Sequence, residues 1–140
     1  MVDLLLDKVH DAYSVLSKIA RKTDLNKCNC CSNSNNIYLK AENLQLTGSF
    51  KLRGAYYKIS KLSQEDKQKG VIACSAGNHA QGVALAAKEN NIPATIFIPA
   101  TAPLSKIEAT KSYGAKACLV DGVYDDAYAK ALELRDSEGY

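Results

Sequence analysis

The chain has 140 residues, about the length of one ordinary domain and enough to bury a single apolar core. Charged residues make up 24% and apolar residues 46% of it, which is typical of a globular protein and excludes a disordered or collagen-like chain. Its 18 basic and 15 acidic residues are spread along the sequence without a dense basic run, so we expect no nucleic-acid partner.

The N-terminal region predicts a helix from Asp3 to Ala20, with apolar residues such as Leu6 and Val9 on one face. Charged residues, among them Asp7 and Lys18, interrupt these apolar residues, so the region lacks the unbroken apolar core of a signal peptide or a membrane span. We therefore expect no membrane association and a cytoplasmic protein whose cysteines stay reduced.

Residues 26–36 are rich in Asn, Ser and Cys and predict a surface loop. Cys28, Cys30 and Cys31 lie close enough together in the sequence to suggest a metal site at first sight. The chain has only two histidines, however, and no second cysteine pair follows at a spacing typical of zinc ligands. The sequence therefore predicts no metal.

A short strand is predicted at Ile37 to Lys40, and a helix at Ser49 to Leu62 with Ser49 as its N-terminal cap. Lys51 then lies in the first helical turn, where a cation opposes the positive end of the helix dipole. That position, with Arg53 close by, favours the uncharged amine, which is the form that attacks a carbonyl carbon. Lys51 is therefore a candidate nucleophile, and the alternative is an ordinary solvated lysine.

From Gly70 onward, short apolar stretches alternate with helical patterns. The predicted order is strand 71–74, a helix entered through the turn at 75–79, strand 94–98, helix 104–113, strand 116–120 and helix 125–136. Such alternation predicts an α/β fold in which an open parallel sheet lies between layers of helices, an αβα arrangement. Ligands of such sheets bind beyond the carboxyl ends of the strands, which is where the turn at 75–79 is expected.

That turn consists of Ser75, Ala76, Gly77, Asn78 and His79. Its backbone N–H groups open onto a helix N-terminus, which stabilises an anion such as a carboxylate or phosphate, and three of its side chains add hydrogen-bonding groups. The glycines of this region match neither the dinucleotide-binding motif nor the phosphate-loop motif, which excludes those nucleotide sites. The alternative is an ordinary turn with a capping asparagine.

Two stretches carry a more specific signal together than either does alone, namely SFKLRGA at residues 49–55 and SAGNHAQGVA at residues 75–84. With them the chain resembles the threonine deaminase family (threonine ammonia-lyase, serine/threonine dehydratase) of pyridoxal-phosphate enzymes. The resemblance extends from Ile37 to the last predicted helix. It implies PLP fold type II, the tryptophan-synthase-β-like fold. Residues 1–48 would then belong to a larger cofactor-anchoring domain that is mostly absent, and residues 49–140 would form the small αβα domain.

The resemblance also implies roles for single residues. The lysine matching Lys51 carries the cofactor covalently and removes the Cα proton of the substrate, and Phe50 lies against it. Asn78 hydrogen-bonds the ring oxygen of the cofactor, and the turn from Ser75 to His79 holds the substrate carboxylate. Related racemases usually place a second serine where this chain has Ala76, which favours elimination over racemisation.

The implied reaction is the β-elimination of a hydroxy amino acid, threonine to 2-oxobutanoate and ammonia, or serine to pyruvate and ammonia. The preference between these two substrates stays open. So does the choice between isoleucine biosynthesis and threonine catabolism. By resemblance we expect the full-length enzyme to be a homo-oligomer, either a dimer or a tetramer.

The chain departs from the family pattern near its start, where Asp24 follows the segment 21–23 at a position where members have Thr-Pro. The family's glycine-rich loop for the cofactor phosphate and its partner for the pyridine nitrogen come later than Tyr140. The chain thus resembles an N-terminal part, which we expect to be inactive alone. Two other hypotheses are a non-catalytic α/β ligand-binding module and a fragment that docks onto a full-length partner.

Overall fold

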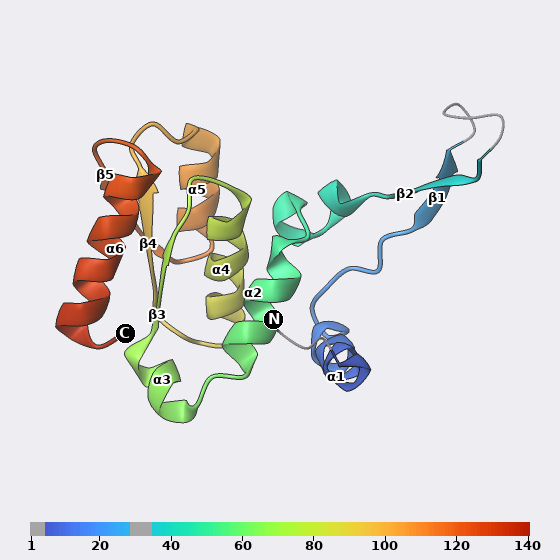
Figure 1. Ribbon diagram of the computed structural model, residues 1–140, viewed down its shortest axis with the longest axis horizontal. Helices are drawn as coiled ribbons and strands as arrows, with labels where there is room; N and C mark the ends of the chain where they lie inside the picture. The colour runs from blue at the N-terminus through green and yellow to red at the C-terminus, as the bar shows by residue number, and fades with distance from the viewer. Residues whose placement is uncertain (1–4, 29–34) are drawn as a thin grey trace.

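The structure is a computed structural model that describes residues 5–28 and 35–140. Figure 1 shows a body, in which helices cover both sides of a parallel sheet, and an arm of one helix and a β-hairpin that projects from it. Among the described residues, every helix is too short or too polar to span a lipid bilayer.

The arm begins with α1 (Leu6–Leu16). Of the helix predicted from Asp3 to Ala20, residues 3 and 4 lie outside the described residues, and the predicted C-terminal end is too late. It continues to β1 (Leu25–Cys28), which pairs antiparallel with β2 (Ile37–Lys40). The prediction of a strand at β2 is confirmed. The loop predicted at residues 26–36 is wrong in its first part, because β1 is held by backbone hydrogen bonds to β2 and its polar side chains face solvent.

The cysteines of this region were expected to be reduced. Cys30 and Cys31 lie outside the described residues, whereas Cys28 is disulfide-bonded, which makes that expectation wrong for Cys28. Cys74 and Cys118 are free, half-buried thiols in two strands of the body. Within the described part of the chain, no three His, Cys, Asp or Glu side chains gather closely enough to hold a metal ion.

The sheet of the body consists of β3 (Val71–Cys74), β4 (Ala94–Pro99) and β5 (Lys116–Val120), in the order β3-β4-β5. Both neighbouring pairs are parallel, and Cys74 at the end of β3 lies opposite Phe97 of β4. All of these strands were predicted from the sequence. Their parallel pairing confirms the predicted α/β class.

The helices of the body surround this sheet. They are α2 (Lys51–Ser60), α3 (Gln64–Lys69), α4 (Asn78–Glu89), α5 (Leu104–Ser112) and α6 (Tyr124–Glu138), and the short 3₁₀ turns η1 (Glu42–Leu44) and η2 (Leu46–Gly48) lead into α2. In Figure 1, α4 and α5 cover one side of the sheet and α6 the other, while α2 packs against α4. The turn between β3 and α4 therefore lies at the carboxyl edge of the sheet, as predicted.

The core lies between the sheet and α4 and extends to α2. Ile96 and Ile98 of β4 and Leu52 of α2 are almost completely buried. Every residue of α4 from Ala80 to Ala87 is buried, because α4 packs between the sheet and α2. Most of these side chains are small, which lets the two helices approach closely. The packing thereby fixes the start of α4 relative to the start of α2.

Candidate active site

A sharp change of backbone direction precedes α2. Thr47 and Gly48 both have positive φ angles, 64° and 66°, so the chain turns just before the helix. Ser49 follows with an extended backbone and a buried side chain, and its Oγ accepts a hydrogen bond from the N–H of Lys51 at 3.4 Å. The helix itself begins at Lys51, with Phe50 before it. The Ser49 hydroxyl thus contacts the first turn, but the N-terminal cap of α2 is Phe50, so the prediction of Ser49 as the cap is wrong by one residue. The helix is also shorter than the predicted range from Ser49 to Leu62.

The side chain of Lys51 is exposed at this helix start. Its Nζ lies 4.7 Å from the centroid of the Phe50 ring. A cation at this distance from an aromatic ring is attracted by about 0.5 to 1 kcal/mol at an exposed site. Phe50 and Lys51, which the resemblance places against each other, are therefore in contact. The ring holds the amine near the first turn of α2.

Arg53 does not act on Lys51 as expected. Its guanidinium forms an ion pair with the carboxylate of Glu42 in η1, so its charge is largely balanced. This pair was not predicted from the sequence, because Glu42 and Arg53 lie in different elements. The prediction that Arg53 adds positive charge near Lys51 is therefore wrong, and the N-terminus of α2 remains as the source of positive partial charge.

The predicted anion-binding turn connects β3 to α4. Ser75 is buried, its N–H donates to the carbonyl of Phe97 at 3.1 Å, and its Oγ accepts from the N–H of Gly77 at 3.2 Å. The Gly77 N–H is therefore already bonded within the turn. In the part of the chain that the structure describes, no hydrogen bond uses the N–H groups of Asn78 or His79. These donors at the start of α4 can still bind an anion.

His79 lies close enough to Lys51 for the charge of the lysine to affect the pKa of the imidazole. Desolvation lowers the pKa of His79 below its usual value, and the positive charge of Lys51 lowers it further. The imidazole is therefore mainly neutral at pH 7, with one ring nitrogen as donor and the other as acceptor. The sequence predicted His79 as part of the carboxylate-binding turn, but its proximity to Lys51 could not be predicted.

Gly82 allows the stretches 49–55 and 75–84 to pack closely against each other. A Cβ atom built on Gly82 would lie 3.1 Å from the carbonyl carbon of Lys51 and 3.1 Å from the nitrogen of Leu52. Such contacts are tighter than nearly all real Cβ contacts, and the neighbouring atoms are backbone. The absence of a side chain at position 82 thus lets α4 touch the first turn of α2. Gly82 belongs to the stretch 75–84 that carries the resemblance, but its packing role could not be predicted from the sequence.

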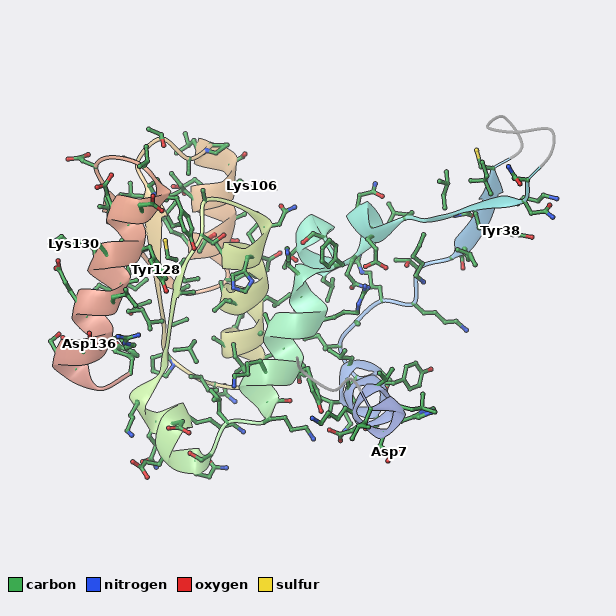
Figure 2. All side chains as sticks on the ribbon, in the orientation of Figure 1. Asp7, Tyr38, Lys106, Tyr128, Lys130 and Asp136 are labelled. Atoms are coloured by element: carbon green, nitrogen blue, oxygen red, sulfur yellow. The ribbon has the colours of Figure 1, made fainter. Side chains whose placement is uncertain are left out.

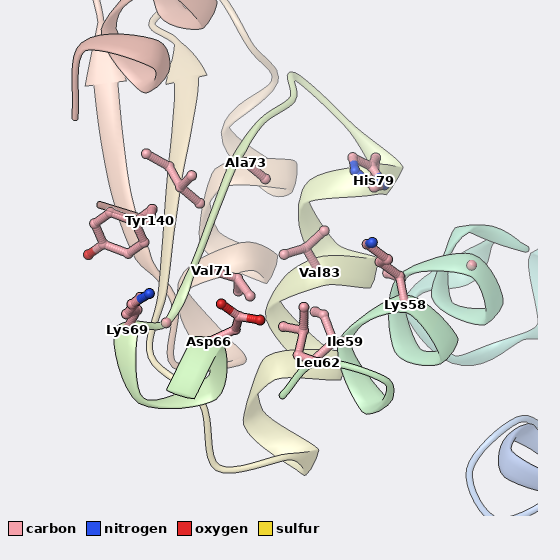
Figure 3. Close-up of a pocket in the computed structure, with 14 residues that line it drawn as sticks. Lys58, Ile59, Leu62, Asp66, Lys69, Val71, Ala73, His79, Val83 and Tyr140 are labelled. Carbon is pink, nitrogen blue, oxygen red and sulfur yellow. The ribbon is translucent and has the colours of Figure 1, made fainter. Parts of the chain in front are cut away.

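A cavity of about 410 Å³ lies between α2, α3, β3 and α4. Figure 3 shows the residues that line it. Apolar side chains such as Ile59 and Val83 form much of its wall, and Lys58 and Asp66 add charges. His79 is the one residue of the turn 75–79 that lines it, and Lys51 does not line it. The candidate lysine is therefore on an open surface of this chain, beside the cavity and not inside it.

A residue from outside both stretches also reaches the turn. The Nζ of Lys106 in α5 donates a hydrogen bond of 2.7 Å to Oδ1 of Asn78. Lys106 is half-buried, and it follows Asn78 by 28 residues in the sequence. This contact could not be predicted, because nothing in a single sequence shows which residue of α5 faces the start of α4.

These groups suit a ligand that carries a carbonyl carbon and anionic oxygens, as pyridoxal phosphate does. Lys51 offers an exposed primary amine for the carbonyl carbon. The amide nitrogen of Asn78 has no acceptor among the described residues and is available to an oxygen of the ligand. The N–H groups at the start of α4 suit a carboxylate. The residues present therefore fit the cofactor that the resemblance implies.

Comparison with known proteins gives consistent matches. Residues 16–140 match the family described as pyridoxal-phosphate dependent enzymes. The L-threonine ammonia-lyase of Thermotoga maritima is 48% identical over 138 residues, which cover 97% of this chain and 34% of that protein. The biosynthetic L-threonine dehydratase of Lactococcus lactis is 57% identical over 109 residues, which cover 76% of this chain and 26% of that protein.

A solved structure matches equally well. The processed form of threonine deaminase isoform 2 from Solanum lycopersicum superposes with a TM-score of 0.89 at 40% identity. The match covers 99% of this chain and 41% of that one. The matched regions thus cover only 26% to 41% of the length of these similar proteins.

Proposed function

The chain belongs to the family of pyridoxal-phosphate dependent enzymes, and on this premise we propose that the protein is a threonine ammonia-lyase. Its fold is that of the type II pyridoxal-phosphate enzymes, as expected from the sequence. The proposed reaction is the β-elimination of threonine, or of serine, to a 2-oxo acid and ammonia. The observation that supports it best is the exposed amine of Lys51 on a helix start whose backbone packs against α4 at Gly82.

Lys51 and Asn78 would hold the cofactor through its carbonyl carbon and its ring oxygen. When bound, pyridoxal phosphate supplies an electron sink for the electrons that remain when a proton leaves Cα of the amino acid. Lys51 is the base that removes this proton, because its amine is the exposed basic group at the helix start. The Phe50 ring restricts where the amine can move.

The turn between β3 and α4 binds the substrate carboxylate in this proposal. The N–H groups of Asn78 and His79 are the available donors, and the Oγ of Ser75 fixes the turn by accepting from Gly77. Ala76 has no hydroxyl with which to protonate Cα from the opposite face, which favours elimination over racemisation.

We also propose that residues 1–48 belong to a larger cofactor-anchoring domain and residues 49–140 to a small one. None of the described residues of α1 is buried, and Leu6 and Tyr13 are 68% and 73% exposed. An exposed apolar helix of this kind suits coverage by a further domain or by another subunit. A homo-oligomeric, cytoplasmic enzyme is part of the same proposal.

Two variants of the turn test its proposed roles. In the whole protein, Asn78→Ala should weaken the binding of pyridoxal phosphate roughly 10- to 100-fold, because a hydrogen bond to a charged or polarised group contributes about 1.5 to 3 kcal/mol. Ser75→Ala should mainly raise KM for threonine, because the turn that receives the carboxylate loses its internal hydrogen bond. Cofactor titration and steady-state release of 2-oxobutanoate measure the two effects.

Asn26→Ala is the matched control, since Asn26 is an exposed asparagine on β1 in the arm. It should leave both constants at their wild-type values. If the Asn78 and Ser75 variants also bind and turn over normally, the turn is only structural and its proposed roles are wrong.

A further inference from the structure

We propose that Lys106 is a positioning residue that fixes the orientation of the Asn78 amide, so that its NH₂ group is presented to a ligand oxygen at Lys51. This inference rests on the proposed function, because the ligand is the cofactor that Lys51 would bind. It adds a residue of α5 that lies outside both of the stretches that carry the resemblance. Figure 2, which labels Lys106, shows it near the end of α5 that faces the turn before α4.

The contact is a direct hydrogen bond between an ammonium group and an amide oxygen. Lys106 Nζ lies 2.7 Å from Asn78 Oδ1, a typical distance for a strong charge-assisted bond. Among the described residues, no carboxylate forms an ion pair with Lys106, whereas Lys111 on the same helix pairs with Glu108. The ammonium group of Lys106 therefore lies against the turn, and no acidic side chain among the described residues neutralises its charge.

An asparagine amide has two ends that differ in chemistry. One end is an oxygen that only accepts hydrogen bonds, and the other is an NH₂ group that only donates. An ammonium group only donates, so Lys106 can bond the oxygen end and never the nitrogen end. The bond therefore excludes the flipped amide, in which the oxygen would face the ligand. With the oxygen held by α5, the NH₂ group of Asn78 faces away from Lys106.

The same bond makes the NH₂ group a better donor. A positive charge beside Oδ1 withdraws electron density from the amide and strengthens the hydrogen bond on its other end. An oxygen atom that carries negative charge, such as the ring oxygen of pyridoxal phosphate, gains most from such a donor. Lys106 thus favours the ionised form of that oxygen without touching it.

The packing of α5 does not depend on the Lys106 side chain. Ile107 and Thr110 are the buried residues of this helix, and the Thr110 hydroxyl donates to the backbone carbonyl of Lys106 at 2.8 Å. Replacing the side chain at position 106 removes neither contact. A Lys106→Met protein should therefore fold, which makes its ligand binding interpretable.

The test compares Lys106→Met, Lys106→Arg and the control Lys111→Met in the whole protein, with pyridoxal phosphate as the probe. Lys106→Met should bind the cofactor roughly tenfold or more weakly. The ionisation seen in the visible band of the bound cofactor should move to higher pH, because the ring oxygen loses a strong donor. Lys106→Arg keeps a charged donor and should restore part of both properties, and Lys111→Met should match the wild type.

A double variant separates positioning from a general charge effect. In an Asn78→Ala background, Lys106→Met should have little further effect, because its action passes through that amide. Equal losses in the two backgrounds would overturn the inference, as would an unchanged affinity and pH midpoint in Lys106→Met.

Borohydride labelling of Lys51 is run on each protein. If Lys51 is labelled but Lys106→Met does not change cofactor binding, the inference is overturned and the proposed function stands. If Lys51 is not labelled in the wild type, the inference and the proposed function are both overturned.

Discussion

The Lys51→Ala protein is expected to lose threonine deamination by a factor of about 10² to 10⁴ or more, because it loses the base that removes the Cα proton and the amine that anchors the cofactor. Lys51 is exposed, so its removal leaves no cavity in the core and should change stability little. Release of 2-oxobutanoate by the whole protein with saturating pyridoxal phosphate measures the loss. An added small primary amine should restore part of the activity, since it can take the proton in place of the missing side chain.

Lys58→Ala provides the matched control, because Lys58 is another exposed lysine of α2 and lines the neighbouring cavity. It should keep near-wild-type turnover. Activity retained in Lys51→Ala, or lost equally in Lys58→Ala, would show that the assignment of the base is mistaken.

Gly82→Ala is expected to destabilise the protein by about 1 to 3 kcal/mol, the usual cost of overpacking a well-packed core. The added methyl group would meet the backbone of Lys51 and Leu52 at 3.1 Å, and backbone atoms cannot move aside as a flexible side chain can. The helices α2 and α4 would have to separate at the start of α2. Cofactor affinity should therefore fall together with the urea midpoint of unfolding.

Gly54→Ala distinguishes this clash from a general effect of replacing a helical glycine. Nothing lies within 4 Å of a Cβ built on Gly54, which is an exposed position within α2. Alanine there should stabilise the protein by about 0.5 to 1 kcal/mol, since it restricts the unfolded chain. The two glycine variants should therefore shift the unfolding midpoint in opposite directions. A shift in the same direction would contradict the close helix contact at Gly82.

The parallel sheet could be predicted because each of its strands is a short apolar stretch between helical patterns. The end of α5 could be predicted because a glycine, Gly114, follows the helical pattern, and in the structure Gly114 has a positive φ of 86°. The helix α3 was missed, because its six residues are polar and show no periodicity. Its start depends on Ser63, whose Oγ accepts from the N–H of Asp66 at 3.0 Å.

The sequence predicted the separate segments of the candidate site, but not how they lie relative to one another. Lys51 and the turn at 75–79 could be identified from residue types and their place at helix starts. Their proximity could not, because it depends on the missing side chain at Gly82 and on the packing of α4 against α2. The Lys106 contact and the Glu42 ion pair join residues from different elements, and no local rule of sequence gives such partners.

The most direct test of the central claim is to find the lysine to which pyridoxal phosphate attaches. The protein is incubated with the cofactor, reduced with borohydride, digested and analysed by mass spectrometry. We expect the pyridoxyl group on Lys51, in the peptide that contains residues 49–55. Two other lysines are the informative competitors, because Lys58 is exposed on the same helix and Lys40 is held by the carbonyl of Thr23. Label on Lys58 or Lys40 with Lys51 unmodified would contradict the account.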